Sequence, residues 1–351
     1  MLALLVFLIV LILISVISFL TSVYSTSTAT TTIFIAPTHQ IFVTNLASDS
    51  VSVINASNDV VVKTIEGLSR PEGIAVSPNG AQVVITNSGN DTVSVVNTLT
   101  DSIIKNITVG HYPDSVAFSP EGNSVYVLNK ENGTISVINT TTYTVTNTTH
   151  GVGDAPTGIA VSPDGKQIFI AAEGYVAVIN TTNYNIVNYT DTYIYNLSLG
   201  SYTGIMPYDI VISPNGEEAF VSSISGSQVY VINTKTYNVI KTILIGFTSD
   251  PDGSEIAISP YGTQVIVAGT NTVMNAPNLD GTVFMINTTT YNITKTLSRI
   301  ETPYAIAFSP NGSNIYVSDY GTKYIYVLNS TTLSITNTIN VGELPSGIVV
   351  T

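Results

Sequence analysis

Short apolar runs separated by turn-forming residues recur along most of the chain. A typical run is Gly-Ile-Ala-Val at residues 73–76, which lies between Pro71 and Pro78. A run of this length is too short for a helix and is bounded by turn residues, so it indicates a β-strand. The pattern therefore predicts an all-β fold.

These runs belong to an internal repeat. The motif Ser-Pro-x-Gly occurs six times, with its proline at Pro78, Pro120, Pro163, Pro214, Pro260 and Pro310. Successive copies are 42, 43, 51, 46 and 50 residues apart, a spacing typical of a four-stranded propeller blade. A second proline precedes each motif by seven residues, or by nine in one copy, at Pro71, Pro113, Pro156, Pro207, Pro251 and Pro303. The run between the two prolines is predicted to be the inner strand of a blade.

Three further strands are predicted in each unit. The second strands lie at 41–45, 83–87, 125–129, 168–172, 219–223, 265–269 and 315–319, and the third at 51–55, 93–97, 135–139, 176–180, 229–233, 283–287 and 325–329. A fourth, threonine-rich strand such as Val239–Leu244 completes the unit. Seven copies predict a seven-bladed β-propeller of four-stranded antiparallel blades.

The chain ends indicate how the ring closes. The C-terminal segment 344–351 matches 70–77, the start of the first complete unit, and stops where the next Ser-Pro would begin. This strand is predicted to pair with the N-terminal strands from Ile41 onward, which leaves no open sheet edge. Residues 33–36, before Pro37, are an alternative inner strand for that blade.

Residues 36 to the end resemble the YVTN family of β-propeller repeats, which occurs in archaeal surface-layer proteins and in secreted or periplasmic bacterial relatives such as YncE-like proteins. The sequences Ile-Phe-Val-Thr-Asn at 41–45 and Val-Val-Ile-Thr-Asn at 83–87 stand where the family has Tyr-Val-Thr-Asn. The family's aspartate at the end of the third strand is asparagine in all seven copies. Either residue favours an Asx turn into the fourth strand. The resemblance implies the fold, and it implies a function only as an expectation.

The N-terminus differs in composition from the rest of the chain. Leu2 to Leu20 form an uncharged apolar run of nearly membrane-spanning length, with no lysine or arginine before it. We predict a hydrophobic helix acting as a transmembrane anchor or signal segment at 1–23, a Ser/Thr-rich linker at 24–35, and the propeller at 36–351. The expected location is extracellular, at the cell surface, membrane-anchored or secreted.

Charge and cysteine content narrow the function classes. Only 9% of the residues are charged, and the net charge is -13. A chain of this charge repels a phosphate backbone and has no basic stripe, so nucleic acid is not an expected partner. With no cysteine, disulfides and thiolate metal sites are excluded.

Asparagine and threonine supply most of the polar surface and create many acceptor motifs for N-glycosylation. Thirteen Asn-x-Ser/Thr sequons are candidates, at Asn55, Asn90, Asn106, Asn132, Asn139, Asn147, Asn180, Asn188, Asn196, Asn287, Asn292, Asn311 and Asn329. Turn asparagines and strand threonines explain part of this number. A surface short of charge would gain hydration from glycans.

Two insertions interrupt the repeat. Residues 183–206 are rich in tyrosine, and residues 270–281 add a loop containing Pro277. Because loops on a repeat scaffold often make the contacts, the first insertion is a candidate protein or glycan contact. An overlong outer hairpin is the alternative.

The loops entering the inner strands are predicted to surround the mouth of the central channel. Carboxylates and tyrosines gather there, and we take as candidate ligand-binding residues Glu72, His111, Asp114, Asp154, Tyr208, Asp209, Asp252 and Tyr304. A hard cation such as Ca²⁺, a cationic peptide or a sugar stacked on tyrosine would suit this ring. The alternative is that these residues only cap exposed turns.

The expected function is therefore an exported binding or surface-assembly module, with the membrane and other cell-surface proteins or glycans as partners. No cofactor is expected, because histidines are few and do not cluster. The alternative is a lactonase-like hydrolase or lyase that uses His111 with Glu72 or Asp114 as acid and base.

Overall fold

The computed structural model describes residues 39–192, 194–196, 201–203, 206–223, 228–245, 255–269 and 281–351, and every element in these ranges is a β-strand. The predicted N-terminal helix at 1–23 and linker at 24–35 lie outside them. Within the described part of the chain, no helix has the length and apolar character needed to cross a membrane.

Seven four-stranded antiparallel sheets form the unit that spans residues 38–351, as predicted. Blade 1 contains β30 (Pro345–Val350), β1 (Gln40–Asn45), β2 (Ser50–Asn55) and β3 (Val60–Ile65). Blade 2 contains β4 (Pro71–Val76), β5 (Gln82–Asn87), β6 (Thr92–Asn97) and β7 (Ser102–Thr108). Blade 3 contains β8 (Pro113–Phe118), β9 (Ser124–Asn129), β10 (Thr134–Asn139) and β11 (Thr144–His150).

The remaining blades repeat the same order from the inside outward. Blade 4 contains β12 (Gly158–Val161), β13 (Gln167–Ala172), β14 (Tyr175–Asn180) and β15 (Ile186–Asp191), and blade 5 contains β18 (Pro207–Ile212), β19 (Glu218–Ser223), β20 (Gln228–Asn233) and β21 (Val239–Leu244). Blade 6 contains β22 (Ile256–Ile258), β23 (Gln264–Gly269), β24 (Gly281–Asn287) and β25 (Ile293–Ile300). Blade 7 contains β26 (Pro303–Phe308), β27 (Asn314–Asp319), β28 (Tyr324–Asn329) and β29 (Ile335–Asn340).

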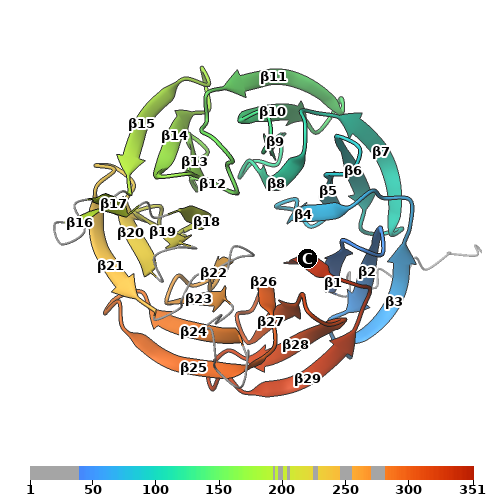
Figure 1. Cartoon of the computed structure of the whole chain (residues 1–351). Helices are drawn as coiled ribbons and strands as arrows, with labels where there is room; N and C mark the ends of the chain where they lie inside the picture. The colour runs from blue at the N-terminus through green and yellow to red at the C-terminus, as the bar shows by residue number, and fades with distance from the viewer. Residues whose placement is uncertain are drawn as a thin grey trace, which may run out of the picture. The chain divides into compact units, whose positions relative to one another are not determined.

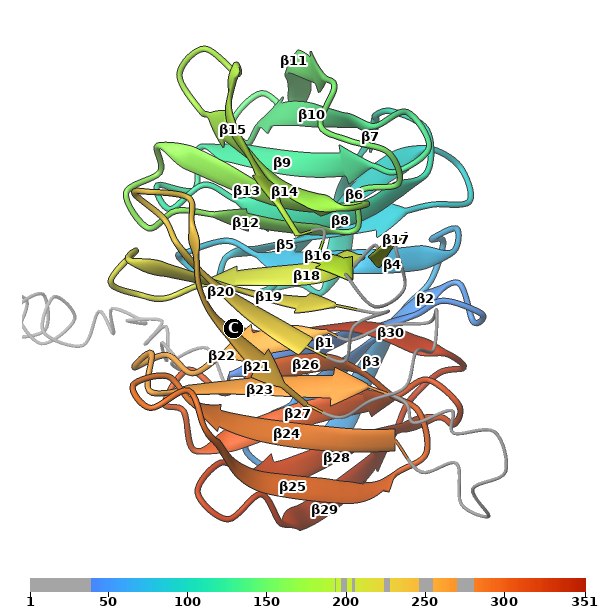
Figure 2. The same cartoon turned by 60° about the vertical axis from the view of Figure 1, so that its left-hand side comes forward.

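The blades are arranged radially around a centre (Figure 1), and each sheet is twisted, as the turned view shows (Figure 2). Inner strands of adjacent blades contact one another all the way round the ring. The insertion at 183–206 contributes all of β15 and a two-stranded hairpin of β16 (Ile194–Asn196) and β17 (Ser201–Thr203). The insertion at 270–281 lies outside the described residues except for Gly281.

The ring closes through the chain ends, as predicted. In blade 1, β30 pairs with β1, with Phe42 opposite Val349 and Val43 opposite Ile348. The backbone N–H of Thr351 also donates to the carbonyl of Gln40, at 2.9 Å. Residues 33–36, the alternative inner strand, lie outside the described residues, and their place beside β1 is taken by β30.

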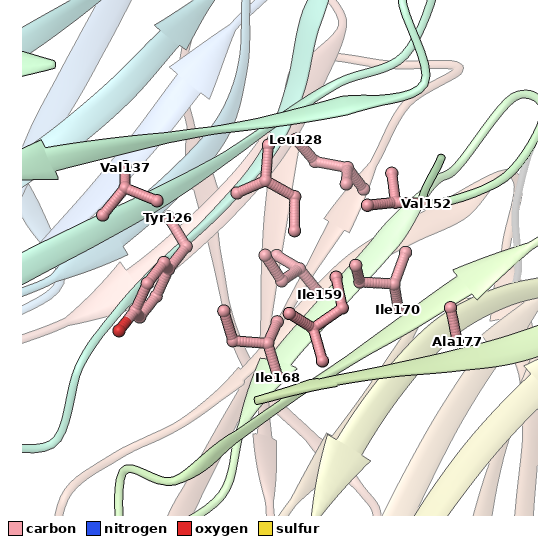
Figure 3. Close-up of a cluster of buried hydrophobic side chains, with 10 residues drawn as sticks. Tyr126, Leu128, Val137, Val152, Ile159, Ile168, Ile170 and Ala177 are labelled. Atoms are coloured by element: carbon pink, nitrogen blue, oxygen red, sulfur yellow. The ribbon is translucent and has the colours of Figure 1, made fainter. Parts of the chain in front are cut away.

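The hydrophobic core lies between blades rather than within them. One cluster joins Tyr126 and Leu128 of β9 to Ile168 and Ile170 of β13 across the boundary between blades 3 and 4 (Figure 3). Six similar clusters fill the other boundaries. Second and third strands are therefore covered on both faces, which explains their continuous apolar runs, whereas the fourth strands at the rim are mostly exposed.

Candidate functional site

The inner strands enter the ring with an irregularity that directs side chains toward the centre. In blade 2, Pro71 pairs with Asn87 and Ile74 with Ile85, so Glu72 and Gly73 have no regular partner in the ladder. The same register shift follows the proline in blades 3, 5 and 7. Bulges of this kind re-aim the residues that they contain. In these four blades the two residues after the proline are thus freed from the sheet and available to the channel.

Hydroxyl groups of the second strands hold these bulges in place. Thr86 accepts a hydrogen bond from the backbone N–H of Gly73, at 2.8 Å, and donates to the carbonyl of Asp114 in the next blade, also at 2.8 Å. In blade 1, Thr44 donates to the carbonyl of Glu72, at 2.8 Å. The threonine of the Tyr-Val-Thr-Asn pattern therefore joins the inner strands of adjacent blades.

A cavity of about 220 Å³ opens among the inner strands. Its polar lining residues are Glu72, Asp114, Ser115, Thr157, Tyr208, Asp209, Glu255, Tyr304 and Ser346. Blades 1 to 7 all contribute, but not equally: blades 2, 3, 5 and 6 supply the carboxylates, and blades 5 and 7 the tyrosines. The repeat therefore produces an asymmetric acidic site.

Two of the carboxylates occupy a position where three other blades have glycine. These glycines lie very close to the neighbouring inner strand. A Cβ on Gly73 would lie 2.2 Å from the carbonyl oxygen of Asp114, and one on Gly158 would lie 2.8 Å from that of Tyr208. A Cβ on Gly347 would lie 2.7 Å from the carbonyl oxygen of Glu72. Asp209 and Glu255 stand at the same distance, five residues, before the proline of their Ser-Pro-x-Gly motifs. Only blades 5 and 6 therefore place a carboxylate at this position.

On one side of the cavity, Glu72 and Asp114 form a hydrogen-bonded cluster. Oε1 of Glu72 accepts from the hydroxyls of Ser88, at 2.8 Å, and Tyr112, at 3.0 Å. Oδ2 of Asp114 lies 3.0 Å from Nζ of Lys130. Burial, followed by the charge of Asp114 and a hydrogen bond with it, raises the pKa of Glu72 to about 7.

On the other side, Asp209 and Glu255 have backbone partners. The carboxylate of Asp209 accepts from the N–H groups of Ile210, at 2.8 Å, and Ile256, at 3.1 Å. Burial nevertheless raises the pKa of Asp209 to about 6. Burial and the nearby charge of Asp209 also raise the pKa of Glu255 well above its ordinary value. These two acids accordingly resist ionisation when the cavity holds no counter-charge.

The two tyrosines are hydrogen-bonded to each other. The hydroxyls of Tyr208 and Tyr304 are 2.7 Å apart, and the ring of Tyr304 contacts that of Tyr320 with 5.1 Å between centroids. Burial raises the pKa of each cavity tyrosine well above 10.0. Both therefore stay neutral and can donate or accept hydrogen bonds.

The predicted site residues fall into three groups. Glu72, Asp114, Tyr208, Asp209 and Tyr304 line the cavity together. Asp252 lies outside the described residues. His111 and Asp154 are exposed and do not line the cavity.

His111 belongs to a separate surface cluster. Its Nδ1 lies 2.9 Å from Asp91 and its Nε2 lies 3.0 Å from Glu131. The hydrogen bond and charge of Asp91, together with the charge of Glu131, raise the pKa of His111. The predicted pairing of His111 with Glu72 or Asp114 as acid and base is therefore not formed in this geometry.

Sequence reasoning missed Glu255. The candidate residues were placed by their distance from the upstream proline, but in blade 6 this proline, Pro251, precedes Pro260 of the Ser-Pro-x-Gly motif by nine residues instead of seven. Counting back from Pro260 instead aligns Glu255 with Asp209, so the signal was present in the spacing. As to metals, the described residues contain no group of three or more histidine, cysteine, aspartate or glutamate side chains that could hold an ion.

Comparison with known proteins supports the propeller assignment. Residues 73–188 match the model of the YncE-like β-propeller family. The matched segment runs from within β4 into β15 and includes Asp114. No curated protein matches the chain in sequence.

Solved structures share the fold over most of the chain. Hydrazine synthase from Kuenenia stuttgartiensis is 21% identical, with a TM-score of 0.70 over 80% of this chain and 89% of that chain. A functionally unknown protein from Desulfotomaculum acetoxidans DSM 771 is 15% identical, with a TM-score of 0.70 over 89% and 98%. A "putative 6-phosphogluconolactonase" from Bacteroides uniformis ATCC 8492 is 18% identical, with a TM-score of 0.68 over 89% and 99%. At these identities the likeness shows the fold alone.

Proposed function

We propose that this chain is a ligand-binding β-propeller that takes a small organic cation, bearing an ammonium or guanidinium group, into its central cavity. The observation that carries the proposal is the convergence of Glu72, Asp114, Asp209 and Glu255 on one cavity. Among the described residues that bond to these carboxylates, Lys130 is the single cation, and it contacts only Asp114. A cationic ligand would supply the missing counter-charge.

The raised pKa values are consistent with a cation as the ligand. Burial holds the pKa of Glu72 at about 7 and that of Asp209 at about 6, so each carboxyl group is partly protonated near neutral pH. A positive charge placed beside them favours the ionised forms. Binding is therefore expected to release protons and to strengthen as the pH rises.

An organic cation suits the cavity better than the Ca²⁺ considered from sequence. The carboxylates come from different blades, and the described residues form no cluster of three metal-ligating side chains. An ammonium or guanidinium group instead bonds to separated oxygens through several N–H donors. The cavity, about 220 Å³, has room for a small molecule of this kind.

The apolar run at Leu2 to Leu20 supports an exported, surface-located protein, secreted or anchored at the membrane. With the resemblance to YVTN repeats, we place the proposed binding module at the cell surface, where other surface proteins or glycans are its expected neighbours.

A hydrolase or lyase is the second candidate, favoured by one observation. A carboxyl group with its pKa held at about 7, as for Glu72, can donate or accept a proton near neutral pH. A phosphorylated substrate, as suggested by the lactonase-like fold neighbour, would bring negative charge into an acidic cavity. Because the acidic cavity would repel such a substrate, an enzyme with this site would require a neutral or cationic substrate.

Calorimetric titration of the full chain tests the binding proposal. The probes are methylguanidinium, a linear diamine and tetramethylammonium, with a neutral alcohol of similar size as control. Asp209→Asn is expected to weaken binding of the best cation at least about tenfold at pH 8, while Glu217→Gln, an exposed carboxylate outside the cavity lining, leaves it unchanged.

Equal affinity for the alcohol, or no binding of any cation at pH 8, would contradict the proposal. The second candidate makes a different prediction: Glu72→Gln abolishes turnover of a lactone or glycan substrate, and His111→Ala leaves it unaffected.

A further inference from the structure

The turns between third and fourth strands lie on the face opposite the cavity entrance. In blade 2, β4 begins at the entrance beside Glu72, so the antiparallel order β4-β5-β6-β7 brings the end of β6, at Asn97, to the far face. The other blades follow the same order. Seven asparagines end the third strands there, at Asn55, Asn97, Asn139, Asn180, Asn233, Asn287 and Asn329.

Each asparagine has the same structural role. In blade 3, Oδ1 of Asn139 accepts hydrogen bonds from the backbone N–H groups of Thr141 and Thr142, both at 2.9 Å. The corresponding bond to the second residue after the asparagine is present in all seven blades. These Asx turns explain the asparagines without any modification.

The first and third residues after the asparagine are also explained by the fold. The threonine next to the asparagine donates to the glycine carbonyl of the adjacent Ser-Pro-x-Gly turn, as Thr140 does to Gly122 at 2.8 Å, in blades 2 to 6. The third residue, where it is threonine, donates its hydroxyl to the asparagine Oδ1, as Thr142 does at 3.2 Å.

The second residue after the asparagine is different, because its side chain has no role that recurs from blade to blade. In blade 2 this residue is Leu99, which is 86% exposed, and in blade 5 it is the exposed Lys235. The position thus accepts an apolar or a charged side chain. In blades 3, 4, 6 and 7 it is threonine, and within the described structure these exposed hydroxyls make no hydrogen bond: Thr141, Thr182, Thr289 and Thr331.

In six other sequons the second hydroxyl is bound within the protein, whereas in the strand sequons of Asn106 and Asn147 the described structure gives the hydroxyls of Thr108 and Thr149 no such bond. Thr92 and Thr134 accept hydrogen bonds from Asn87 and Asn129, at 3.1 and 3.0 Å, and Thr294 donates to the carbonyl of Met285, at 3.2 Å. In blade 1, Ser57 donates to Asn55 itself. The fold accounts for those six hydroxyls and leaves the four turn threonines unexplained.

We propose that Asn139, Asn180, Asn287 and Asn329 are N-glycosylation sites of the exported chain. The co-reactant is a lipid-pyrophosphate-linked oligosaccharide. The asparagine Nδ2 forms a bond to the anomeric carbon of the sugar, the bond from that carbon to the pyrophosphate oxygen breaks, and Nδ2 gives up one proton as the lipid pyrophosphate leaves. The threonine two residues on completes the acceptor motif.

The geometry of the turns leaves the reacting atom accessible. Oδ1 of each asparagine is occupied by the turn, whereas no described residue accepts a hydrogen bond from its Nδ2, and none of these Nδ2 atoms is among the buried unpartnered ones. Glycans at four of the seven turns would hydrate this face and leave the cavity entrance clear.

Peptide mapping by mass spectrometry, on the full chain purified from its own cells, tests the proposal. We expect glycopeptides at the four sites and unmodified peptides at Asn97 and Asn233, the matched turns without a sequon. Thr141→Val is expected to remove the glycan from Asn139, and Thr141→Ser to retain it. Leu99→Thr is expected to add a glycan at Asn97.

Unmodified peptides at all four asparagines would overturn the proposal, as would retention of the Asn139 glycan in Thr141→Val. Because Thr141 makes only a backbone contact, its variants are expected to fold like the parent chain, which thermal denaturation of the same preparations checks. Cation binding in the cavity does not depend on the result.

Discussion

The two faces of the propeller use the repeat differently. On the turn face, all seven blades repeat the bond from a backbone N–H to the asparagine Oδ1, and six blades carry the Ser-Pro-x-Gly turn. At the entrance, the residue after the proline changes from blade to blade, as Glu72, Asp114, Thr157, Tyr208, Tyr304 and Ser346 show. Repetition on one face maintains the fold, and variation on the other creates a site.

The same contrast separates positions within one inner strand. Gly73, Gly158 and Gly347 are required because the neighbouring strand is too close for a Cβ. Asp209 and Glu255 replace that glycine in two adjacent blades and create the acidic side of the cavity. Blades 3 and 7 have Ser115 and Ala305 at this position, so the carboxyl groups, rather than the loss of glycine, distinguish blades 5 and 6.

Loss of ring closure should have the largest effect. Removing residues 344–351 deletes β30, exposes the edge of β1 and takes Ile348 from the core cluster between blades 7 and 1. We expect the cooperative urea unfolding transition, followed by circular dichroism, to be lost. Removing Thr351 alone is the control and should preserve the transition. A truncated chain with an unchanged midpoint would show that β30 does not close the ring.

A methyl group at Gly73 should have the next largest effect. Its Cβ would lie 2.2 Å from the carbonyl oxygen of Asp114, so backbone must shift, and we expect Gly73→Ala to cost about 3 kcal/mol. Ser115, the corresponding residue of blade 3, already has a Cβ, and Ser115→Ala should change the free energy of unfolding by less than about 1 kcal/mol. Similar losses in the two variants would refute the steric explanation.

The fold could be predicted from sequence because its determinants are local and repeated. Apolar runs between prolines and glycines placed the start of the second strand within one residue in all seven blades, as with 83–87 and β5. They placed the start of the third strand equally well in six blades. The match of 344–351 to 70–77 also predicted the closing strand. The core of a propeller forms between neighbouring blades of the same structure, so a sequence pattern that predicts one blade predicts how the blades pack around the ring.

The site could be predicted only in part, because it depends on register and loop geometry. The hydrogen bond between the hydroxyls of Tyr208 and Tyr304 was not predicted. His111 is close to Pro113 in sequence, yet it faces Asp91 and Glu131 on the surface. Neither outcome follows from spacing, since each depends on where a neighbouring blade places its side chains.

Titration of the cavity should have a smaller effect on stability, and its sign follows from the raised pKa of Glu72. In the unfolded chain the Glu72 carboxyl loses its proton near pH 4.5, whereas in the native state it keeps the proton up to about pH 7. The contribution of Glu72 to stability is therefore highest below pH 4.5 and falls as the pH rises to about 7. Asp209 and Glu255 contribute slopes of the same sign, because their pKa values are also raised.

Glu72→Gln removes one of these titrations. We expect the loss of stability between pH 5 and pH 8, measured by urea denaturation, to shrink by on the order of 2 kcal/mol. Glu217→Gln, for which the side chain is exposed, is the control and should retain the parent slope. A parent protein more stable at pH 8 than at pH 5 would contradict the burial of these acids without a counter-charge.

The smallest effect is expected for a hydrogen bond that recurs between adjacent blades on the turn face. Nε2 of Gln82 donates to the hydroxyl of Tyr143 in the next blade, at 2.8 Å, and Gln167 makes the same contact with Tyr237. Tyr143→Phe removes one acceptor and should cost about 1 kcal/mol.

Tyr184 provides the matched control. It occupies the same turn position, but Ser124 stands where blade 2 has Gln82, and within the described part of the chain the Tyr184 hydroxyl has no such partner. Tyr184→Phe should therefore leave the urea midpoint nearly unchanged. If Tyr143→Phe, like Tyr184→Phe, leaves the urea midpoint unchanged, the ring that phenylalanine retains, rather than the bond between blades, is what the repeat maintains.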